Sequence, residues 1–176
     1  MKIGIILTTT REGRVSDQVG NWLLEQSKAY SKSQFEIVDL KDFSLPILGE
    51  ADPNNGIARW KEKLSELDGY IFALAEYNHS VPGVLKNALD YVGTEMANKA
   101  AAIVSYGAAG GARSAEHLRT IFGQTNTADI NTHVLLSLFY DFENFTTFKP
   151  LDIHGTNLDQ LFKSLDAWSK ALQTIR

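Results

Sequence analysis

The sequence predicts one α/β domain, residues 1–176, built as three layers around a five-stranded parallel sheet. Short apolar runs of strand length alternate along the chain with longer segments whose apolar residues recur at helical spacing. Polar stretches follow the first, third and fourth apolar runs. The length of 176 residues suits one hydrophobic core, and no repeat, low-complexity segment or linker interrupts the pattern.

The first half of the chain contains two strands and two helices. Residues 2–8 form a buried strand, and Ser16 is the expected N-cap of the helix that follows. The inward residues of that helix are Val19, Trp22, Leu23 and Tyr30. Residues 35–40 form the second strand, and a long loop, residues 41–55, leads to a short helix. That helix is marked by Ile57, Trp60, Leu64 and Leu67.

The second half continues the alternation. Residues 70–74 form the third strand, and Pro82 opens the next helix, where a missing N–H costs nothing. Residues 100–106 and 133–139 form the last two strands. The helix between them buries Ala115, Leu118 and Phe122. The apolar residues of the closing helix are Leu158, Leu161, Phe162, Leu165, Trp168 and Leu172. Strand order 2-1-3-4-5 suits this pattern and places the loops after strands 1 and 3 at the switch point, where ligands bind.

Composition narrows the possible functions. A net charge of −4 gives no basic face for nucleic acid. The absence of cysteine excludes thiolate catalysis and cysteine-ligated metals, so any redox chemistry belongs to a cofactor. The four histidines are scattered, and we expect no metal site. No segment has the length of a membrane span or of a signal-peptide core, and we expect a soluble cytoplasmic protein.

The loop after the first strand, residues 8–16, is rich in hydroxyl and guanidinium groups. A helix N-terminus stabilises an anion, and Arg11 and Arg14 add charged donors suited to phosphate. The loop is neither a Walker A sequence nor G-x-G-x-x-G, which disfavours nucleoside triphosphates and the usual dinucleotide mode. From this pattern alone, a solvated turn with surface arginines is an equally good interpretation.

The loop after the third strand carries the longest motif. Residues 76–90 resemble the E-Y-N-x-x-x-P-G-x-L-K-N-A-x-D motif of the NAD(P)H-dependent FMN reductases, a family with the flavodoxin-like fold. Residues 105–113 are similar to the family's S-Y-G-x-x-G-G-x-R segment. The family usually has proline where Ala75 stands, and Thr8 and Thr9 stand in for its glycine and serine.

The resemblance implies which residues bind FMN. Thr9, Arg11 and Ser16 would contact the phosphate; Arg14 is a further candidate, with a side chain that we expect to point to solvent. Glu76, Tyr77 and Asn78 would line the flavin ring, largely through main chain. The pyrimidine side of the ring would lie along Ser105, Tyr106 and Gly107. We expect no side chain to act as a catalytic acid or base, His79 included, because the flavin performs the chemistry.

The function implied is transfer of hydride from NADPH or NADH to FMN and reduction of a small-molecule acceptor, namely a quinone, an azo compound or a flavin. Two alternatives remain: a flavodoxin-type electron carrier without NAD(P)H turnover, and a flavodoxin-like protein that no longer holds flavin. Arg113 either reaches a nicotinamide nucleotide phosphate or, as we favour, forms a charge pair. Lys86, Asn87 and Asp90 are expected to be structural.

The resemblance also implies that the protein self-associates as a homodimer or homotetramer. The candidate contacts are an aromatic cluster and a proline loop. The cluster, residues 139–148, is either a loop packed beneath the final helix or a subunit interface. The loop, residues 45–48, resembles part of the family's F-x-L-P-x-L segment.

Overall fold

The structure, a computed structural model, describes residues 1–30 and 32–176. Its main sheet is parallel throughout, with the order β2-β1-β3-β4-β5, which confirms the predicted flavodoxin-like arrangement. The strands are β1 (Lys2–Leu7), β2 (Gln34–Asp39), β3 (Gly69–Ala75), β4 (Ala100–Gly107) and β5 (Ala128–Ser137). Within the described residues, no helix is long and apolar enough to cross a membrane.

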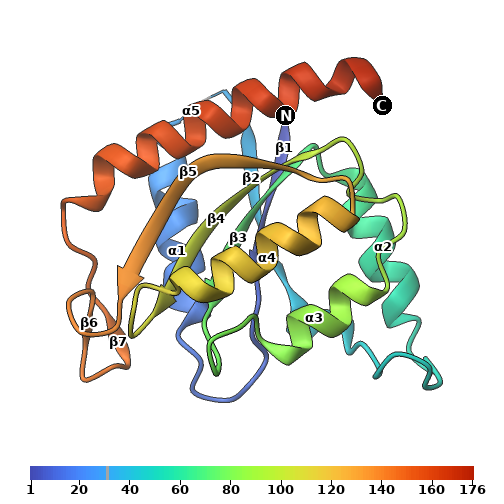
Figure 1. The fold of residues 1–176 in the computed structure, drawn as a ribbon, viewed down its shortest axis with the longest axis horizontal. Helices are drawn as coiled ribbons and strands as arrows, with labels where there is room; N and C mark the ends of the chain where they lie inside the picture. Colours follow the sequence, from blue (N-terminus) through green and yellow to red (C-terminus); the bar gives the residue numbers. More distant parts are fainter. Residues whose placement is uncertain (31) are drawn as a thin grey trace.

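Helices cover the two faces of the sheet (Figure 1). One face packs against α1 (Ser16–Ser27) and α5 (His154–Leu172). The other face packs against α2 (Gly56–Glu66), α3 (Gly83–Asp90) and α4 (Ala112–Gln124). The described residues also include two short 3-10 helices, η1 (Leu40–Phe43) and η2 (Gln173–Ile175).

Every residue of β3 and β4 is buried, because helices lie on both sides of these central strands. The register pairs Leu7 with Ala73 and Ala75 with Tyr106. The carboxyl ends of β1, β3 and β4 therefore meet at one edge of the sheet. The three polar loops singled out in the sequence all begin there.

Three details differ from the prediction. The strand β5 begins at Ala128 instead of residue 133, because its first half, at a sheet edge, contains one buried residue, Ile130, and forms no apolar run. The helix α1 has Val15 at its N-cap position, not Ser16. Trp168, expected to face inward from the closing helix, is 48% exposed.

A small antiparallel hairpin follows β5 and was not predicted. Its strands are β6 (Phe142–Glu143) and β7 (Thr147–Phe148), each too short to leave an alternating pattern in the sequence. Phe142 is buried, and the Phe148 ring packs against Phe142 and, edge-on, against Trp22 of α1. This half of the aromatic cluster is therefore packing, whereas Phe139, Tyr140 and Phe145 are exposed.

Candidate functional site

A cavity of about 220 Å³ lies at the edge of the sheet where the loops after β1, β3 and β4 meet. Five of the residues predicted from the sequence line it, namely Arg11, Glu76, Tyr77, Tyr106 and Gly107. Apolar side chains, including Val15, Leu138 and Phe145, complete the wall. The other five predicted residues do not line the cavity, namely Thr9, Arg14, Ser16, Asn78 and Ser105.

The loop after β1 presents a row of free backbone donors. Among the described residues, none accepts a hydrogen bond from the N–H groups of residues 10–14, which directly precede α1. The Arg11 side chain is exposed; its Nε donates to the Tyr77 hydroxyl at 2.9 Å and its Nη1 to the Glu12 carbonyl at 3.1 Å. Free amides, a helix N-terminus and an exposed guanidinium together form a donor set that suits a phosphate dianion.

Arg14 is oriented differently from our expectation. Its side chain is only 8% exposed, so the prediction that it points to solvent is wrong. Its Nη1 donates to Asp39 Oδ1 at 2.7 Å and its Nη2 to Asp17 Oδ1 at 2.6 Å. Burial alone would raise the pKa of Asp39, but the hydrogen bonds and positive charges of Arg14 and Lys41 together lower it. Arg14 thus fastens the loop to β2 and α1, and a direct role toward phosphate stays a prediction without support from this geometry.

Thr9 and Ser16 lie beneath the loop, where their hydroxyls pair at 2.8 Å and both residues are almost fully buried. Ser16 is the first residue of α1, and its hydroxyl is turned toward Thr9 instead of capping the helix. Burial raises the pKa of Tyr106 to about 12, against an opposing effect of hydrogen bonding with Thr9 and Ser16. The pair of hydroxyls thus joins the start of the loop to the first residue of α1.

The loop after β3 is a tight turn, residues 77–80, which we call the first turn. The backbone N–H and carbonyl groups of Tyr77 and Ser80 bond to one another at 3.0 Å in both directions. Asn78 and His79 have φ values of 48° and 66°, the pair of left-handed residues that a type I′ turn requires. Asn78 is therefore explained by backbone shape, because asparagine tolerates positive φ better than most residues.

The Glu76 carboxylate is directed away from the cavity, toward α4. It accepts a hydrogen bond from the Arg113 backbone at 3.1 Å and forms an ion pair with the Arg113 guanidinium. Burial would raise the pKa of Glu76, but the bonds from Arg113 lower it. Arg113 also donates to His79 Nε2 at 3.1 Å. Arg113 therefore forms the charge pair that we favoured, and Glu76 is left to face the cavity through its backbone and stem.

The glycine-rich loop after β4 depends on a residue that the sequence did not indicate. The Ser105 hydroxyl donates to the Gly110 carbonyl at 2.6 Å, so at 2.7 Å it accepts from His133 Nε2. Burial lowers the pKa of His133 to about 4, which keeps the ring neutral. Ser105 is fully buried and its side chain holds the glycine turn from behind, not from the cavity. His133 lies in an edge strand, 28 residues away along the chain, and no local pattern connects it with Ser105.

Thr8 and Ala75, two departures from the family pattern, contact one another. The Thr8 hydroxyl donates to the Ala73 carbonyl at 2.8 Å and accepts from the Ala75 N–H at 3.3 Å. A proline at position 75 would have no N–H to donate. The threonine thus joins the ends of β1 and β3 directly beside the cavity.

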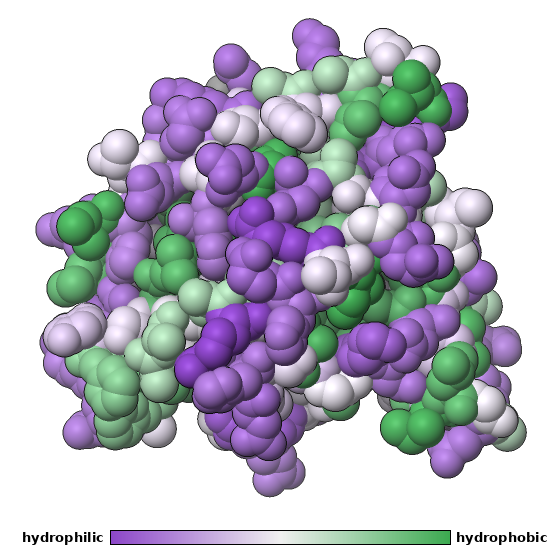
Figure 2. Space-filling view, viewed as in Figure 1, coloured by the Kyte–Doolittle hydropathy of each residue, from purple (hydrophilic) through white to green (hydrophobic). Residues whose placement is uncertain are grey.

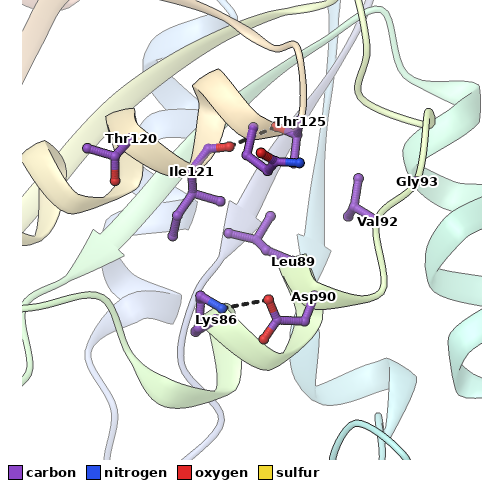
Figure 3. Close-up of a pocket in the computed structure, with 9 residues that line it drawn as sticks. Lys86, Leu89, Asp90, Val92, Gly93, Thr120, Ile121 and Thr125 are labelled. Atoms are coloured by element: carbon purple, nitrogen blue, oxygen red, sulfur yellow. Dashed lines mark hydrogen bonds and ion pairs between the residues drawn. The ribbon is translucent and has the colours of Figure 1, made fainter.

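Other cavities contain none of the predicted site residues. A cavity of about 520 Å³ lies between α3 and α4, with the ion pair of Lys86 and Asp90 on one side and Thr120, Ile121 and Thr125 on the other (Figure 3). Another, of about 440 Å³, lies beside the loop after β2. Asn87 holds that loop by donating to the Pro46 carbonyl at 2.7 Å. The bonds of Lys86, Asn87 and Asp90 are thus structural, as predicted.

The fold and site together define a flavodoxin-like protein with an anion-favouring loop at the switch point of its sheet. The chain belongs to the NADPH-dependent FMN reductase family, whose model matches residues 1–141. It is 33% identical over 131 residues to an NAD(P)H-dependent FMN reductase of Schizosaccharomyces pombe, and the match covers 69% of this chain and 66% of the relative. The family and the fold class predicted from the sequence are both confirmed.

Two further comparisons point the same way. An NAD(P)H:quinone oxidoreductase of Solanum tuberosum is 34% identical over 131 residues, covering 69% of this chain and 66% of the relative. The chain thus spans about two thirds of the length of these curated relatives. The solved structure of FerB, a flavoenzyme NAD(P)H:acceptor oxidoreductase from Paracoccus denitrificans, superposes with a TM-score of 0.77 at 17% identity over 97% of both chains, which supports the fold.

Proposed function

We propose that the protein is an NAD(P)H-dependent oxidoreductase that holds FMN at the edge of the sheet and reduces a small-molecule acceptor, such as a quinone, an azo compound or a flavin. The observation that carries the proposal is the row of free N–H groups at residues 10–14, a row that includes Arg11, whose exposed side chain belongs to a residue lining the cavity. When bound, FMN supplies the chemistry that accepts hydride from the nicotinamide and passes electrons on.

The protein's contribution is binding, orientation and exclusion of water. The loop amides and Arg11 would hold the phosphate, and Tyr77 holds Arg11 in place through its hydroxyl. The backbone of the first turn and Gly107 would line the ring. At Gly107 a Cβ would come within 3.1 Å of Glu76 Cβ and of the Gly111 nitrogen, so glycine lets the loops after β3 and β4 pack closely beside the cavity. Val15 and Leu138 provide apolar wall.

The absorption spectrum of the purified protein with added FMN tests the proposal. We expect the protein to take up FMN, and the flavin band to bleach under argon when NADPH or NADH is added. Uptake without bleaching would favour the electron carrier. No uptake of FMN would favour the flavin-free alternative and would overturn the proposal.

A pair of variants tests the phosphate assignment. Loss of a hydrogen bond to a charged group costs roughly 1.5–3 kcal/mol, so Arg11→Ala should weaken FMN binding about tenfold to hundredfold. Riboflavin has the same ring but no phosphate, and its affinity should be nearly unchanged. Lys28→Ala, which removes the same charge at the far end of α1, is the control. Equal weakening of FMN and riboflavin by Arg11→Ala would refute the assignment, as would no effect on either. Both affinities follow from fluorescence-quenching titrations.

We further propose that the protein self-associates as a homodimer or homotetramer. Phe139 and Tyr140 are 61% and 75% exposed near the hairpin, and Ile47 and Leu48 are 63% and 56% exposed in the loop after β2. Figure 2 shows hydrophobic surface over both regions. Sedimentation at micromolar concentration should reveal a species heavier than the 19.5 kDa chain, and a single 19.5 kDa species would contradict the proposal.

A further inference from the structure

The turn between β6 and β7, residues 143–146, carries a phenylalanine in an unfavourable conformation. We call it the second turn. The Thr146 N–H donates to the Glu143 carbonyl at 3.1 Å, and the two central residues, Asn144 and Phe145, have φ values of 51° and 61°. Turns of this shape strongly prefer Asn-Gly, because a side chain at positive φ crowds the backbone. Asparagine tolerates this conformation, but phenylalanine there is an outlier.

Packing does not account for Phe145 at this position. Its side chain is 56% exposed, whereas the hairpin's contribution to the core comes from Phe142 and Phe148. The one aromatic neighbour of Phe145 is Phe139, itself exposed, at a ring-centroid distance of 5.6 Å within the described chain. A strained residue that does not stabilise the core indicates a functional position.

The side chain of Phe145 lines the same cavity as Arg11 and Tyr77. The hairpin that carries it is held firmly by Gln18 of α1. The Gln18 side-chain amide donates to the Thr146 carbonyl at 2.7 Å and accepts from the Phe148 N–H at 2.8 Å. Gln18 thus fixes the backbone that follows Phe145, and the pairing of β6 with β7 ties it to the strand before the turn, so Phe145 remains at the mouth of the cavity.

We propose that Phe145 is a specificity-determining residue, the apolar wall against which a planar aromatic electron acceptor lies. This inference rests on the proposed function. The polar side of the cavity, with Arg11 and Tyr77, suits the cofactor, and Phe145 offers an aromatic face to a second flat ring. Phe145 also lies beyond residues 1–141, the part of the chain that the family model matches.

The test compares two acceptors with the FMN-loaded protein. One NAD(P)H supplies a hydride, which with one solvent proton converts 1,4-naphthoquinone to its hydroquinone. The same two electrons reduce two ferricyanide ions and release a proton. Naphthoquinone is flat and aromatic, whereas ferricyanide has no ring to pack against Phe145. The loss of one aromatic contact corresponds to about a threefold to tenfold change in binding.

We expect Phe145→Gly to raise the KM for naphthoquinone about threefold to tenfold and to leave kcat/KM for ferricyanide within about twofold. Asn144→Gly, a change in the same turn but outside the cavity lining, should alter neither. Titration of the oxidised, FMN-loaded protein with naphthoquinone, without NAD(P)H and followed by flavin absorbance, should give the same loss of affinity. Because glycine relieves the positive φ, Phe145→Gly should melt no lower than wild type.

Distinct results separate the possible failures. If wild type reduces neither acceptor, the proposed function fails. If ferricyanide turnover is normal and Phe145→Gly leaves naphthoquinone binding unchanged, Phe145 is not the acceptor wall. An equal loss of FMN affinity would assign Phe145 to the cofactor instead, and a changed sedimentation coefficient with unchanged KM would assign it to a subunit interface. Either of these two results overturns the inference.

Discussion

Two turns, each with two successive residues at positive φ, stand at the mouth of the cavity. The first turn, residues 77–80, has Asn78 and His79 at positive φ, and the second turn, residues 143–146, has Asn144 and Phe145. Each places asparagine at the first central position, where it is tolerated. They differ in the second residue and in what keeps the turn in place.

Charged and ionisable groups attach the first turn to α4. Glu76 and His79 bond to Arg113, and the Ser80 hydroxyl lies 2.9 Å from His117 Nδ1. The second turn is attached to α1 chiefly by the neutral amide of Gln18. The first turn is thus stabilised by charged groups and the second by neutral hydrogen bonds, and the two should respond differently to substitution and to pH.

The largest expected effect follows loss of the charged attachment. Glu76→Ala leaves the Arg113 guanidinium and a helix N-terminal N–H without their partner, so we expect the free energy of unfolding to fall by roughly 1.5–3 kcal/mol. Urea denaturation measures this change. The control is Glu116→Ala, which removes a carboxylate that is 74% exposed on α4, the helix that carries Arg113. It should change the free energy of unfolding by less than about 0.5 kcal/mol. Equal effects of the two substitutions would contradict the role of Glu76.

Acid should weaken the attachment of the first turn but not that of the second, and the loss of stability should be similar to that of Glu76→Ala. The folded-state pKa of Glu76 is lowered from 4.5, so its contribution to stability is present above pH 4.5 and is lost as the pH falls through the lowered value. The stability difference between wild type and Glu76→Gln should therefore shrink below pH 4.5. The corresponding difference for Gln18→Ala should stay constant, because an amide does not titrate. Thermal melts between pH 3 and 7 would show whether the two curves diverge.

Loss of the neutral attachment should have a smaller effect. Gln18→Ala removes two partly exposed hydrogen bonds, and we expect a loss of about 1 kcal/mol in the free energy of unfolding. The KM for naphthoquinone should also rise, because Phe145 is no longer held at the cavity. Gln26→Ala, an exposed glutamine on the same helix, is the matched control. A stability loss without any change in KM would separate the hairpin from acceptor binding.

The smallest effect is expected at the second central residue of the first turn. His79→Gly relieves the positive φ but loses the bond from Arg113 and adds backbone entropy to the unfolded chain, so these terms should offset one another within about 0.5 kcal/mol. Differential scanning calorimetry beside Phe145→Gly would compare the two turns directly. A large loss for His79→Gly would indicate that His79 contributes more than its hydrogen bond with Arg113 accounts for.

The sequence predicted those parts of the fold that depend on continuous local patterns. The apolar runs of β1, β3 and β4 are fully buried in the centre of the sheet, and the loops that follow them do meet at one edge. The strand β5 was placed too late because its first half, at a sheet edge, forms no apolar run. The β6–β7 hairpin was missed because two-residue strands have no period.

Side-chain directions at the site were less predictable. Arg11 and Arg14 look equivalent in the sequence, yet Arg14 is turned inward by Asp39, which lies 25 residues away and meets it only through the pairing of β1 with β2. His133 was missed because its partner Ser105 lies on the neighbouring strand. Both contacts are set by the tertiary structure, which no local motif describes. The roles of the predicted cofactor-binding residues toward FMN stay predictions.

The contact between Thr8 and Ala75 has a consequence for chimaeras built with the family's usual residues. Proline at position 75 alone would leave the Thr8 hydroxyl without the N–H that it accepts, and glycine at position 8 alone would leave the Ala75 N–H without an acceptor. Each single exchange therefore leaves one partner of this bond unpaired at the junction of β1 and β3, whereas the double exchange removes both partners. Positions 8 and 75 are therefore epistatic, and a chimaera with the family's usual residues should carry both exchanges together.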